Sequence, residues 1–227
     1  MVKDIAPVEL NGKIYPRRAI RTRLIGFGEN LAAVLREYVA PELRPGEWIA
    51  ISEKVVSVAQ NNVRHISTVR AGWLARLIVK GVKKYPHDIG FSRPEKMQVA
   101  VEIAGYPRMI LALILGALGK LVGIRGIFWV VAGNRVSEID GFNPDAMSPY
   151  DEYAVLPPRD PAKVCAEIER EFSLPATVID GNNINVKIIA VSPSLPVSAA
   201  LARQILLDNP MGQEDEMTPF ILVGPAR

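Results

Sequence analysis

The sequence predicts an α+β protein, in which strands and helices are mixed along one chain. Apolar or alternating runs typical of strands occur at residues 20–25, 48–51, 126–132, 176–179, 186–191 and 218–223. Stretches with apolar residues at helical spacing lie between these runs, and turn residues such as Gly26-Phe-Gly28 separate the two kinds of element. Mixed strands and helices in this order are typical of an α/β or α+β protein.

The composition indicates an ordinary globular chain. Its 227 residues are 49% hydrophobic and 22% charged, and a chain of this length can bury roughly 70% of its unfolded surface. The single cysteine, Cys165, excludes a disulfide scaffold and a cysteine-based zinc site within the chain, and the presence of only two histidines argues against a multi-histidine metal centre. We expect one domain over residues 1–227. Two sub-lobes are the alternative, but no linker marks a boundary between them.

The first part of the chain reads as two strands, each followed by a helical segment. Residues 20–25 alternate apolar and polar side chains as a half-buried strand does, and 29–39 has apolar residues at helical spacing. The apolar strand 48–51 leads into 53–60, a short helix or extended piece. A helix over 68–84 has one apolar stripe and carries basic residues on its other face.

The middle of the chain reads as two helices, a buried strand and a long loop. Ser92-Arg-Pro-Glu95 fits a capping box at the start of a helix that runs to about residue 104. In the next helix, the apolar run Met109–Gly119 is shorter than the about 20 residues of a membrane span, so we expect it to be buried. Residues 126–132 predict a buried strand, and 134–158 a long loop of the kind that often carries function.

The last part of the chain alternates helices and strands. Asp160 as N-cap and Pro161 in the first turn begin a helix that ends near Phe172. Strands at 176–179 and 186–191 follow. A helix over 197–207 precedes the final strand, which we place at residues 218–223 by the same apolar pattern.

The charge is unevenly distributed. Between Asn61 and Lys96 there are eight basic and two acidic residues, whereas Asp208–Glu216 holds four acidic residues and no basic one. The basic segment could attract a phosphate-bearing ligand or a nucleic acid, or it could be a solvated helix face. Without a nucleic-acid-binding motif we do not expect a nucleic-acid partner. With no apolar stretch of signal-peptide length, we expect no membrane association and a cytoplasmic protein.

Several catalytic motifs are absent from the sequence. There is no GxxxxGK[ST] phosphate loop, and Gly26-Phe-Gly28 lacks the third glycine of a dinucleotide fingerprint. The chain also has no GxSxG elbow and no HExxH motif, so acyl-enzyme and zinc hydrolysis have no support. The remaining candidates are carboxylates and amides in loops.

Two polar loops follow predicted strands and carry those candidates. Asp140, with Glu138 close by, comes after the run 126–132, and Asp180 comes after the run 176–179, with Asn182 two residues on. Ligands gather at the carboxyl ends of strands in open α/β sheets, so Asp140 and Asp180 could share Mg²⁺ or Mn²⁺. The alternative is that these Asp-Gly and Asn-Asn pairs only form turns.

Two further segments could line a site. In Ser52–Gln60, Lys54 lies just past a predicted strand and could neutralise a phosphate, or it could be an ordinary surface lysine. The polar run from Asp208 to Pro219 precedes the last strand and could line a site or be an acidic surface loop.

Taken in order, several of these segments resemble the coenzyme F-420 ligase family. The resemblance is carried by LIGFGENL (24–31), Pro45-Gly-Glu47, ISEKVVSVAQ (51–60), and VLPPRDPAKVCAEIEREF (155–172) followed by ATVID. Members of that family attach glutamate to a deazaflavin precursor with GTP. The resemblance implies the F-420 gamma-glutamyl ligase fold in an intertwined homodimer, a divalent metal, GTP as co-substrate, and a small phosphate-bearing acid and an amino acid as substrates.

The resemblance also assigns residues. Asp140 matches an aspartate of the family's first metal loop, Asp180 the aspartate of its Ser-Asp-Thr, and Lys54 the lysine of its Lys-Val-Val-Ser run. It therefore implies Asp140 and Asp180 as catalytic and metal-ligating residues, with Glu138 and Asn182 as further metal ligands. Lys54, with Ser57 and Gln60 nearby, is the implied nucleotide-binding group. The implied reaction is amide ligation through an acyl phosphate.

The sequence departs from the family pattern at arginine positions. The Gly-Arg expected after Gln60 is Asn61-Asn62, and Asn182-Asn-Ile-Asn-Val186 stands where the family has Gly-Arg-Pro-Trp-Arg. Arginine binds anions in a bidentate fashion, so these losses favour an alternative. In that alternative the chain is a non-catalytic relative that binds a nucleotide or another phosphate-bearing ligand.

Overall fold

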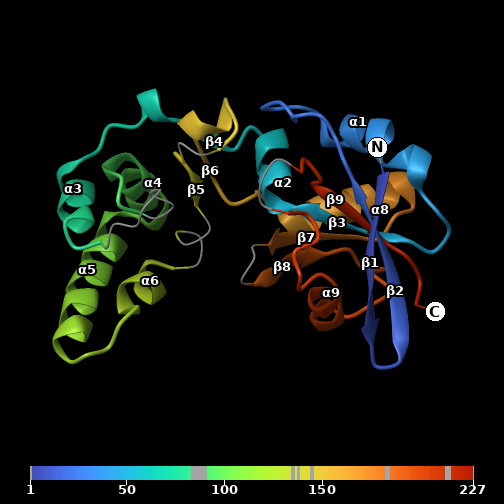
Figure 1. The fold of residues 1–227 in the computed structure, drawn as a ribbon. Coiled ribbons are helices and arrows are strands. Elements are labelled where there is room, and N and C mark those ends of the chain that lie inside the picture. Colours follow the sequence, from blue (N-terminus) through green and yellow to red (C-terminus); the bar gives the residue numbers. More distant parts are fainter. Residues whose placement is uncertain are drawn as a thin grey trace. The chain divides into compact units, whose positions relative to one another are not determined.

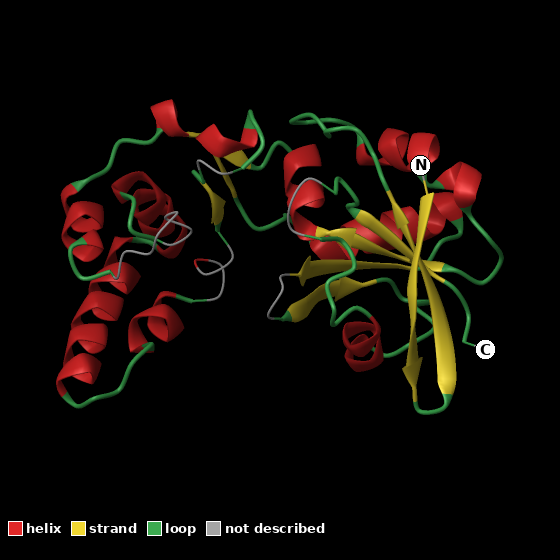
Figure 2. Cartoon of the chain, viewed as in Figure 1, coloured by secondary structure: helices red, strands yellow, loops and turns green. Residues whose placement is uncertain are grey.

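The computed structural model describes residues 2–82, 91–133, 136, 139–143, 146–181, 185–212 and 216–226. The chain forms two compact units, one from residues 1–62 and 158–227 and the other from residues 63–157. It passes from the first unit to the second after residue 62 and returns after residue 157. Both units contain helices and strands, so the protein is mixed α/β, consistent with the predicted α+β class (Figure 2).

The first unit is built on a six-stranded sheet with the order β1-β2-β9-β3-β7-β8. Its strands are β1 (Val2–Leu10), β2 (Lys13–Ile20), β3 (Trp48–Ser52), β7 (Ala176–Gly181), β8 (Val186–Val191) and β9 (Phe220–Val223). Its helices are α1 (Leu31–Tyr38), the 3-10 helix η1 (Ala40–Glu42), α2 (Glu53–Ala59), α8 (Pro161–Phe172) and α9 (Ala199–Ile205). Figure 1 shows α9 on one side of the sheet and α1 and α8 on the other.

The strand directions bring three carboxyl ends to one edge of this sheet. β3 and β7 are parallel, with Ser52 opposite Ile179. β9 is antiparallel to both β2 and β3, so β2 also runs in the direction of β3. We call the edge at which β2, β3 and β7 end the carboxyl edge. It is where ligands bind in many open α/β sheets.

Alternate residues of the central strands fill the two faces of the sheet. On β3, Trp48 and Ala50 pack with Ile205 of α9. Ile49 and Ile51 are also fully buried and point to the opposite face, because successive strand residues do so. A strand buried on both faces is apolar throughout, which is why β3 could be predicted from its sequence alone.

The hairpin of β1 and β2 was not predicted, although the sequence signals it. Asn11 and Gly12 join the strands with φ of 53° and 73°, and a two-residue turn with positive φ at both positions favours Asn-Gly. The strand predicted over residues 20–25 is wrong, since β2 ends at Ile20. Ile20 pairs with the first described residue of β1, Val2, and with the first of β9, Phe220, so the chain beyond it has no strand to pair with.

The second unit combines four helices with a small sheet of order β4-β6-β5 in its described residues. Its elements are β4 (Val63–His65), the 3-10 helices η2 (Ile66–Thr68) and η4 (Tyr150–Glu152), α3 (Trp73–Val79), α4 (Pro94–Ala104), α5 (Tyr106–Leu121), α6 (Ile127–Ala132), β5 (Asp140–Gly141) and β6 (Tyr153–Val155). Buried residues of α3, α4 and α5 form its core together with Phe142 and Ala154. The segment 134–158, which was predicted as a long loop, contains the short strands β5 and β6.

The strand predicted over residues 126–132 is wrong, because Ile127–Ala132 forms the helix α6. Periodicity alone cannot separate a short buried strand from a short buried helix. Two glycines of α5 decide the packing here. A Cβ added at Gly116 would lie 2.9 Å from Cβ of Phe128, and one added at Gly119 would lie 2.4 Å from Cδ1 of Ile127. The glycines therefore let α6 pack closely against α5.

Helix α5 is buried on one side only, which corrects the prediction of a buried helix. Leu111, Ile114 and Leu118 are 50%, 51% and 54% exposed, and Leu121 is 83% exposed. No helix in the described part of the chain has the length and apolar character to cross a membrane by itself; α4 and α5 meet that test only as a pair, and they are bent by 113°.

Two predicted helix starts differ from the structure, and a third, at Asp160, is confirmed without its capping hydrogen bond. The helix predicted over 68–84 is observed only as α3, and residues 83–90 lie outside the described residues. The Ser92 capping box does not form, because the N-cap of α4 is Arg93. Asp160 is the N-cap of α8, but its side chain makes no capping hydrogen bond.

Arg17 of β2 ties three segments of the first unit together on the α9 face. Its guanidinium donates to the carbonyl oxygens of Ala6 in β1 (3.0 and 2.7 Å) and Ile205 in α9 (2.8 Å). It also forms a bidentate pair with Asp208, at 2.5 and 2.8 Å. Asp208 begins the polar run that leads to β9, so Arg17 fixes the start of that run.

Arg18, the next residue, makes a second buried contact on the opposite face. Its guanidinium donates to both carboxylate oxygens of Glu47 at 2.7 Å and to the carbonyl oxygen of Glu42 at 2.7 Å. Glu47 also accepts from the backbone N–H of Arg44 (2.9 Å). The side chains of Arg18 and Glu47 are 4% and 5% exposed. Water therefore does not solvate these charges, and each is stabilised by the other.

Replacing Glu47 with alanine is expected to lower the free energy of unfolding by about 3–5 kcal/mol, because it leaves the buried guanidinium of Arg18 without its counter-charge. Urea denaturation measures this loss. The control Glu171→Gln removes one partner of the exposed pair with Arg36, and it is expected to cost less than about 1 kcal/mol. Equal losses for the two variants would contradict the role given to Glu47.

Stability should fall in acid partly through Asp208. The hydrogen bonds from Arg17 hold the pKa of this carboxyl below its ordinary value of 3.8. A carboxyl whose pKa is lower in the folded state stabilises the fold above its unfolded pKa, and this contribution disappears as the pH falls through the folded pKa. The stability difference between the natural chain and Asp208→Asn, measured by thermal unfolding, should therefore shrink below about pH 4. A difference that stays constant from pH 7 to strong acid would rule this out.

Candidate functional site

The carboxyl edge of the first unit carries the best-supported candidate site. Ser52, the last residue of β3, lies opposite Ile179, so Asp180 of β7 is the next residue along that edge. The backbone N–H of Ser52 donates to the carbonyl oxygen of Pro219 (3.0 Å), and that of Thr22 donates to Met217 (2.9 Å). The residues just before β9 are thus hydrogen-bonded to the end of β3 and to the segment that follows β2.

Helix α2 starts at this edge and presents the three predicted nucleotide-binding residues differently. Lys54 is exposed in the first turn. Ser57 is only 1% exposed, and its hydroxyl has no hydrogen-bond partner among the described residues. Gln60 is half-buried at the end of the helix. The three residues share one helix, but they do not form one exposed surface.

Gln60 organises a polar cluster with a distant segment of the first unit. Its Nε2 donates to the carbonyl oxygen of Arg159 (2.8 Å), and its Oε1 accepts from the backbone N–H of the same residue (2.7 Å). The guanidinium of Arg159 in turn donates to Oδ1 of Asn62, from Nε at 3.2 Å and Nη2 at 3.0 Å. The segment 158–160 is therefore held against the end of α2.

Arg159 is a candidate anion-binding residue that the sequence analysis missed. The resemblance predicts Gly-Arg at positions 61 and 62, and this chain has asparagines there. In the structure Arg159 places a guanidinium against Asn62, so an arginine is present beside these asparagines. It stands in the PPRDP run, but nothing in the sequence connects that run to residue 62.

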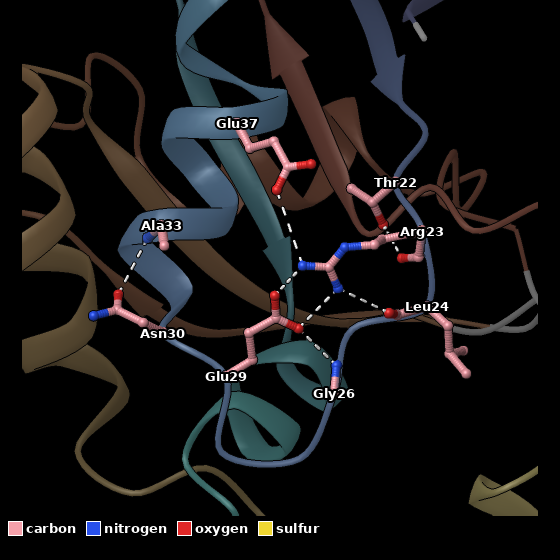
Figure 3. Close-up of polar contacts among 8 residues, drawn as sticks. All are labelled: Thr22, Arg23, Leu24, Gly26, Glu29, Asn30, Ala33 and Glu37. Carbon is pink, nitrogen blue, oxygen red and sulfur yellow. Dashed lines mark hydrogen bonds and ion pairs between the residues drawn. The ribbon is translucent and has the colours of Figure 1, made fainter.

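The glycine turn after β2 is hydrogen-bonded to α2. An ion pair between Arg23 and Glu29 spans the turn (Figure 3). The backbone N–H of Gly28 donates to the carbonyl oxygen of Val58 in α2 (2.9 Å). Glu29 accepts from the N–H of Gly26 (2.8 Å) and forms a bidentate pair with Arg23. The hydrogen bond from Arg23 lowers the pKa of Glu29, which therefore stays ionised. Gly28 has a φ of 74°, a conformation that favours glycine.

A pocket of about 410 Å³ lies between this turn and helices α1, α2 and α8. Gly28 and Gln60 line it on one side, and Ile168 and Phe172 of α8 on another. The lining includes Glu29, Glu167 and Glu171, and no basic residue is among the described residues that line it. This pocket therefore does not favour an anionic group.

The predicted metal-binding residues are distributed over both units. Asp180 belongs to the first unit and Asp140 to the second, so neither unit by itself contains both carboxylates. Asp140 is in β5, and its Oδ1 accepts from the N–H of Gly141 (2.8 Å). Glu138 and Asn182 lie outside the described residues.

The described residues do not assemble a complete metal site. No group of three or more His, Cys, Asp or Glu side chains that could hold a metal ion occurs among them. The argument that placed Asp140 at the end of a strand also fails, because the run before it is α6. Asp180 was predicted to follow a strand that ends at Ile179; it lies instead within β7, next to its last residue, and it pairs across β7 and β8 with Lys187.

Comparison with known proteins agrees with the resemblance seen in the sequence. A family model described as F420-0:Gamma-glutamyl ligase matches residues 19–202. The match begins near the end of β2 and covers β3, α2, the Gln60–Arg159 contact and Asp180, and it includes the whole second unit. A search of curated proteins gave no match to this chain.

Proposed function

Because the chain belongs to the F420-0:Gamma-glutamyl ligase family, we propose that it is a GTP-dependent amide ligase. It would join an amino acid to the carboxylate of a phosphate-bearing acid. Family membership itself implies an activity of the gamma-glutamyl ligase type on small-molecule substrates. The observation that carries the proposal is the match over residues 19–202, and Arg159 supports it by placing an arginine beside Asn62.

The proposed reaction has two balanced steps. A carboxylate oxygen of the acid attacks the γ-phosphorus of GTP, so that an acyl phosphate forms and GDP leaves. The amine of the amino acid then attacks the acyl carbon, inorganic phosphate leaves, and the amine loses a proton. Such transfers depend on positioning and charge neutralisation more than on covalent protein chemistry. We assign the neutralising charges to Arg159, which can bind phosphate in a bidentate way, and to exposed Lys54.

A divalent cation, Mg²⁺ or Mn²⁺, is part of the proposal. When bound, such an ion would neutralise the negative charge of the transferred phosphoryl group. Asp180 and Asp140 remain its proposed ligands, with Glu138 and Asn182 as further candidates. Because the described residues of neither unit form a complete ligand set, no step above is assigned to the ion.

The second candidate function is a non-catalytic relative that binds a nucleotide or another phosphate-bearing ligand. The asparagines at positions 61 and 62, where the family has Gly-Arg, favour it. This alternative predicts that GTP binds without release of phosphate in the presence of an acid and an amino acid.

We also propose that the protein is a homodimer and that the exposed apolar side of the α5–α6 hairpin forms its interface. Val122 and Val130 are 71% and 79% exposed, in addition to the exposed residues of α5. A contiguous exposed apolar surface of this kind usually marks an interaction site. A second copy of the chain is the occupant that the family resemblance implies.

GTP binding tests the function. We expect GTP to bind in the presence of Mn²⁺, and Arg159→Gln to weaken it roughly ten- to hundredfold, since hydrogen bonds to charged groups are strong. Asp180→Asn should remove the dependence of binding on Mn²⁺. Calorimetry measures both, with Arg170→Gln, an exposed arginine of α8, as the control that keeps natural affinity.

The same preparation decides between the two candidate functions. Release of phosphate from GTP that requires the deazaflavin acid and L-glutamate supports the ligase. Binding without that release supports the non-catalytic relative. No binding of GTP at millimolar concentration would overturn the ligase and leave a relative that binds another phosphate-bearing ligand.

The dimer has its own test. Leu118→Glu places a charge on the proposed interface and should convert the protein from a dimer to a monomer of 24.9 kDa in sedimentation equilibrium. Leu207→Glu, a residue 47% exposed in the first unit, should leave the dimer intact. A natural chain that sediments as a monomer would exclude the proposed interface.

A further inference from the structure

A second pocket of the first unit lies between the β1–β2 hairpin and the loop after α9. Its volume is about 700 Å³, within the roughly 300–1,000 Å³ typical of ligand sites. We call it the hairpin pocket. It has no lining residue in common with the pocket beside Gln60, and neither Lys54 nor Arg159 lines it.

The register of the hairpin explains which side chains form the first wall. Lys3 pairs with Ala19 across β1 and β2, so their side chains lie on the same face of the sheet. Ile5 and Arg21, each two residues away along the chain, line the same pocket. Ala19 and Ile5 pack with the cluster around α9. This wall therefore combines an apolar floor with the cations Lys3 and Arg21, which are both solvent-exposed.

The second wall is formed by Asn209, Pro210, Gly212, Glu216 and Thr218, and hydrogen bonds hold Asn209 and Thr218. The N–H of Asn209 donates to the carbonyl oxygen of Leu206 (3.0 Å), and its Nδ2 donates to the carbonyl oxygen of Gly212 (3.1 Å). The hydroxyl of Thr218 donates to Met211 (2.7 Å). Glu216 belongs to this wall, and its carboxylate lies close to Gly212.

Asn209 connects the hairpin pocket to the carboxyl edge. It lines the pocket and is only 5% exposed. A Cβ built on Gly181, the residue after Asp180, would lie 2.7 Å from Oδ1 of Asn209. That oxygen accepts no hydrogen bond from the described residues. The pocket wall is thus in contact with the end of β7, and it contains an acceptor that lacks a donor.

We propose that the hairpin pocket binds a small amino acid, with its carboxylate at Arg21 and Lys3 and its ammonium at Glu216. Two cations on one wall and a carboxylate on the other complement a zwitterion, whereas a purely anionic ligand would be repelled by Glu216. The inference rests on the proposed function, in which an amino acid supplies the amine, and it names where that amine substrate binds.

Two dicarboxylates that differ only in the ammonium group test the proposal on the full chain. L-glutamate should bind in calorimetry, and glutarate should bind about tenfold more weakly, because it has no ammonium for Glu216. Glu216→Gln should remove this difference, because it weakens L-glutamate and strengthens glutarate, which the carboxylate no longer repels. Arg21→Gln should weaken both ligands about tenfold. Lys13→Gln, an exposed lysine at the turn end of the hairpin, is the matched control and should change neither.

The outcomes separate the pocket from the function. If L-glutamate and glutarate bind equally to the natural chain, if neither binds, or if Arg21→Gln and Glu216→Gln retain natural affinity, the proposal is overturned. GTP titrations on the same variants show whether the nucleotide site is intact. GTP binding and turnover without an effect of these variants would exclude the pocket and leave the ligase proposal standing. Circular dichroism of each variant verifies that it is folded.

Discussion

Two adjacent arginines of β2 hold the first unit together. Successive strand residues point to opposite faces, so Arg17 reaches Asp208 and α9 while Arg18 reaches Glu47 on the other side. Each guanidinium is buried, and each also binds a backbone carbonyl oxygen from a segment distant in sequence. A buried arginine must keep all of these partners or remain a desolvated charge. Hence one strand fixes two loops, the loop after α9 through Asp208 and the loop before β3 through Glu47.

The carboxyl edge depends on this arrangement. Arg17 fixes the start of the segment from Asp208 to β9, and the backbone of Ser52 and Thr22 fixes its end. That segment forms one wall of the hairpin pocket and contacts Gly181 beside Asp180. The proposed nucleotide-binding residues of α2 and the proposed amino-acid pocket at the hairpin therefore belong to the same unit.

The elements that could be predicted from sequence have a dominant local signal. β3, β7 and β8 were predicted within two residues of their bounds, since apolar runs ending at turn residues specify a strand locally. α8 was predicted from its proline start and amphipathic spacing. Asn11-Gly12 shows that a clear hairpin signal can be overlooked. α6 was mistaken for a strand because a run of six apolar residues fits either structure, and only its contact with Gly116 and Gly119 decides.

By itself the sequence determined the mixed α/β class, the family, and the position of Asp180 at the end of a strand, because each depends on residues close together in the chain. Tertiary structure alone decided the rest. It placed Arg159 against Asn62, buried Ser57 while exposing Lys54, and assigned Asp140 and Asp180 to different units. Contacts between residues nearly a hundred positions apart leave no periodicity or spacing in the chain, so they emerge only when strands and helices pack.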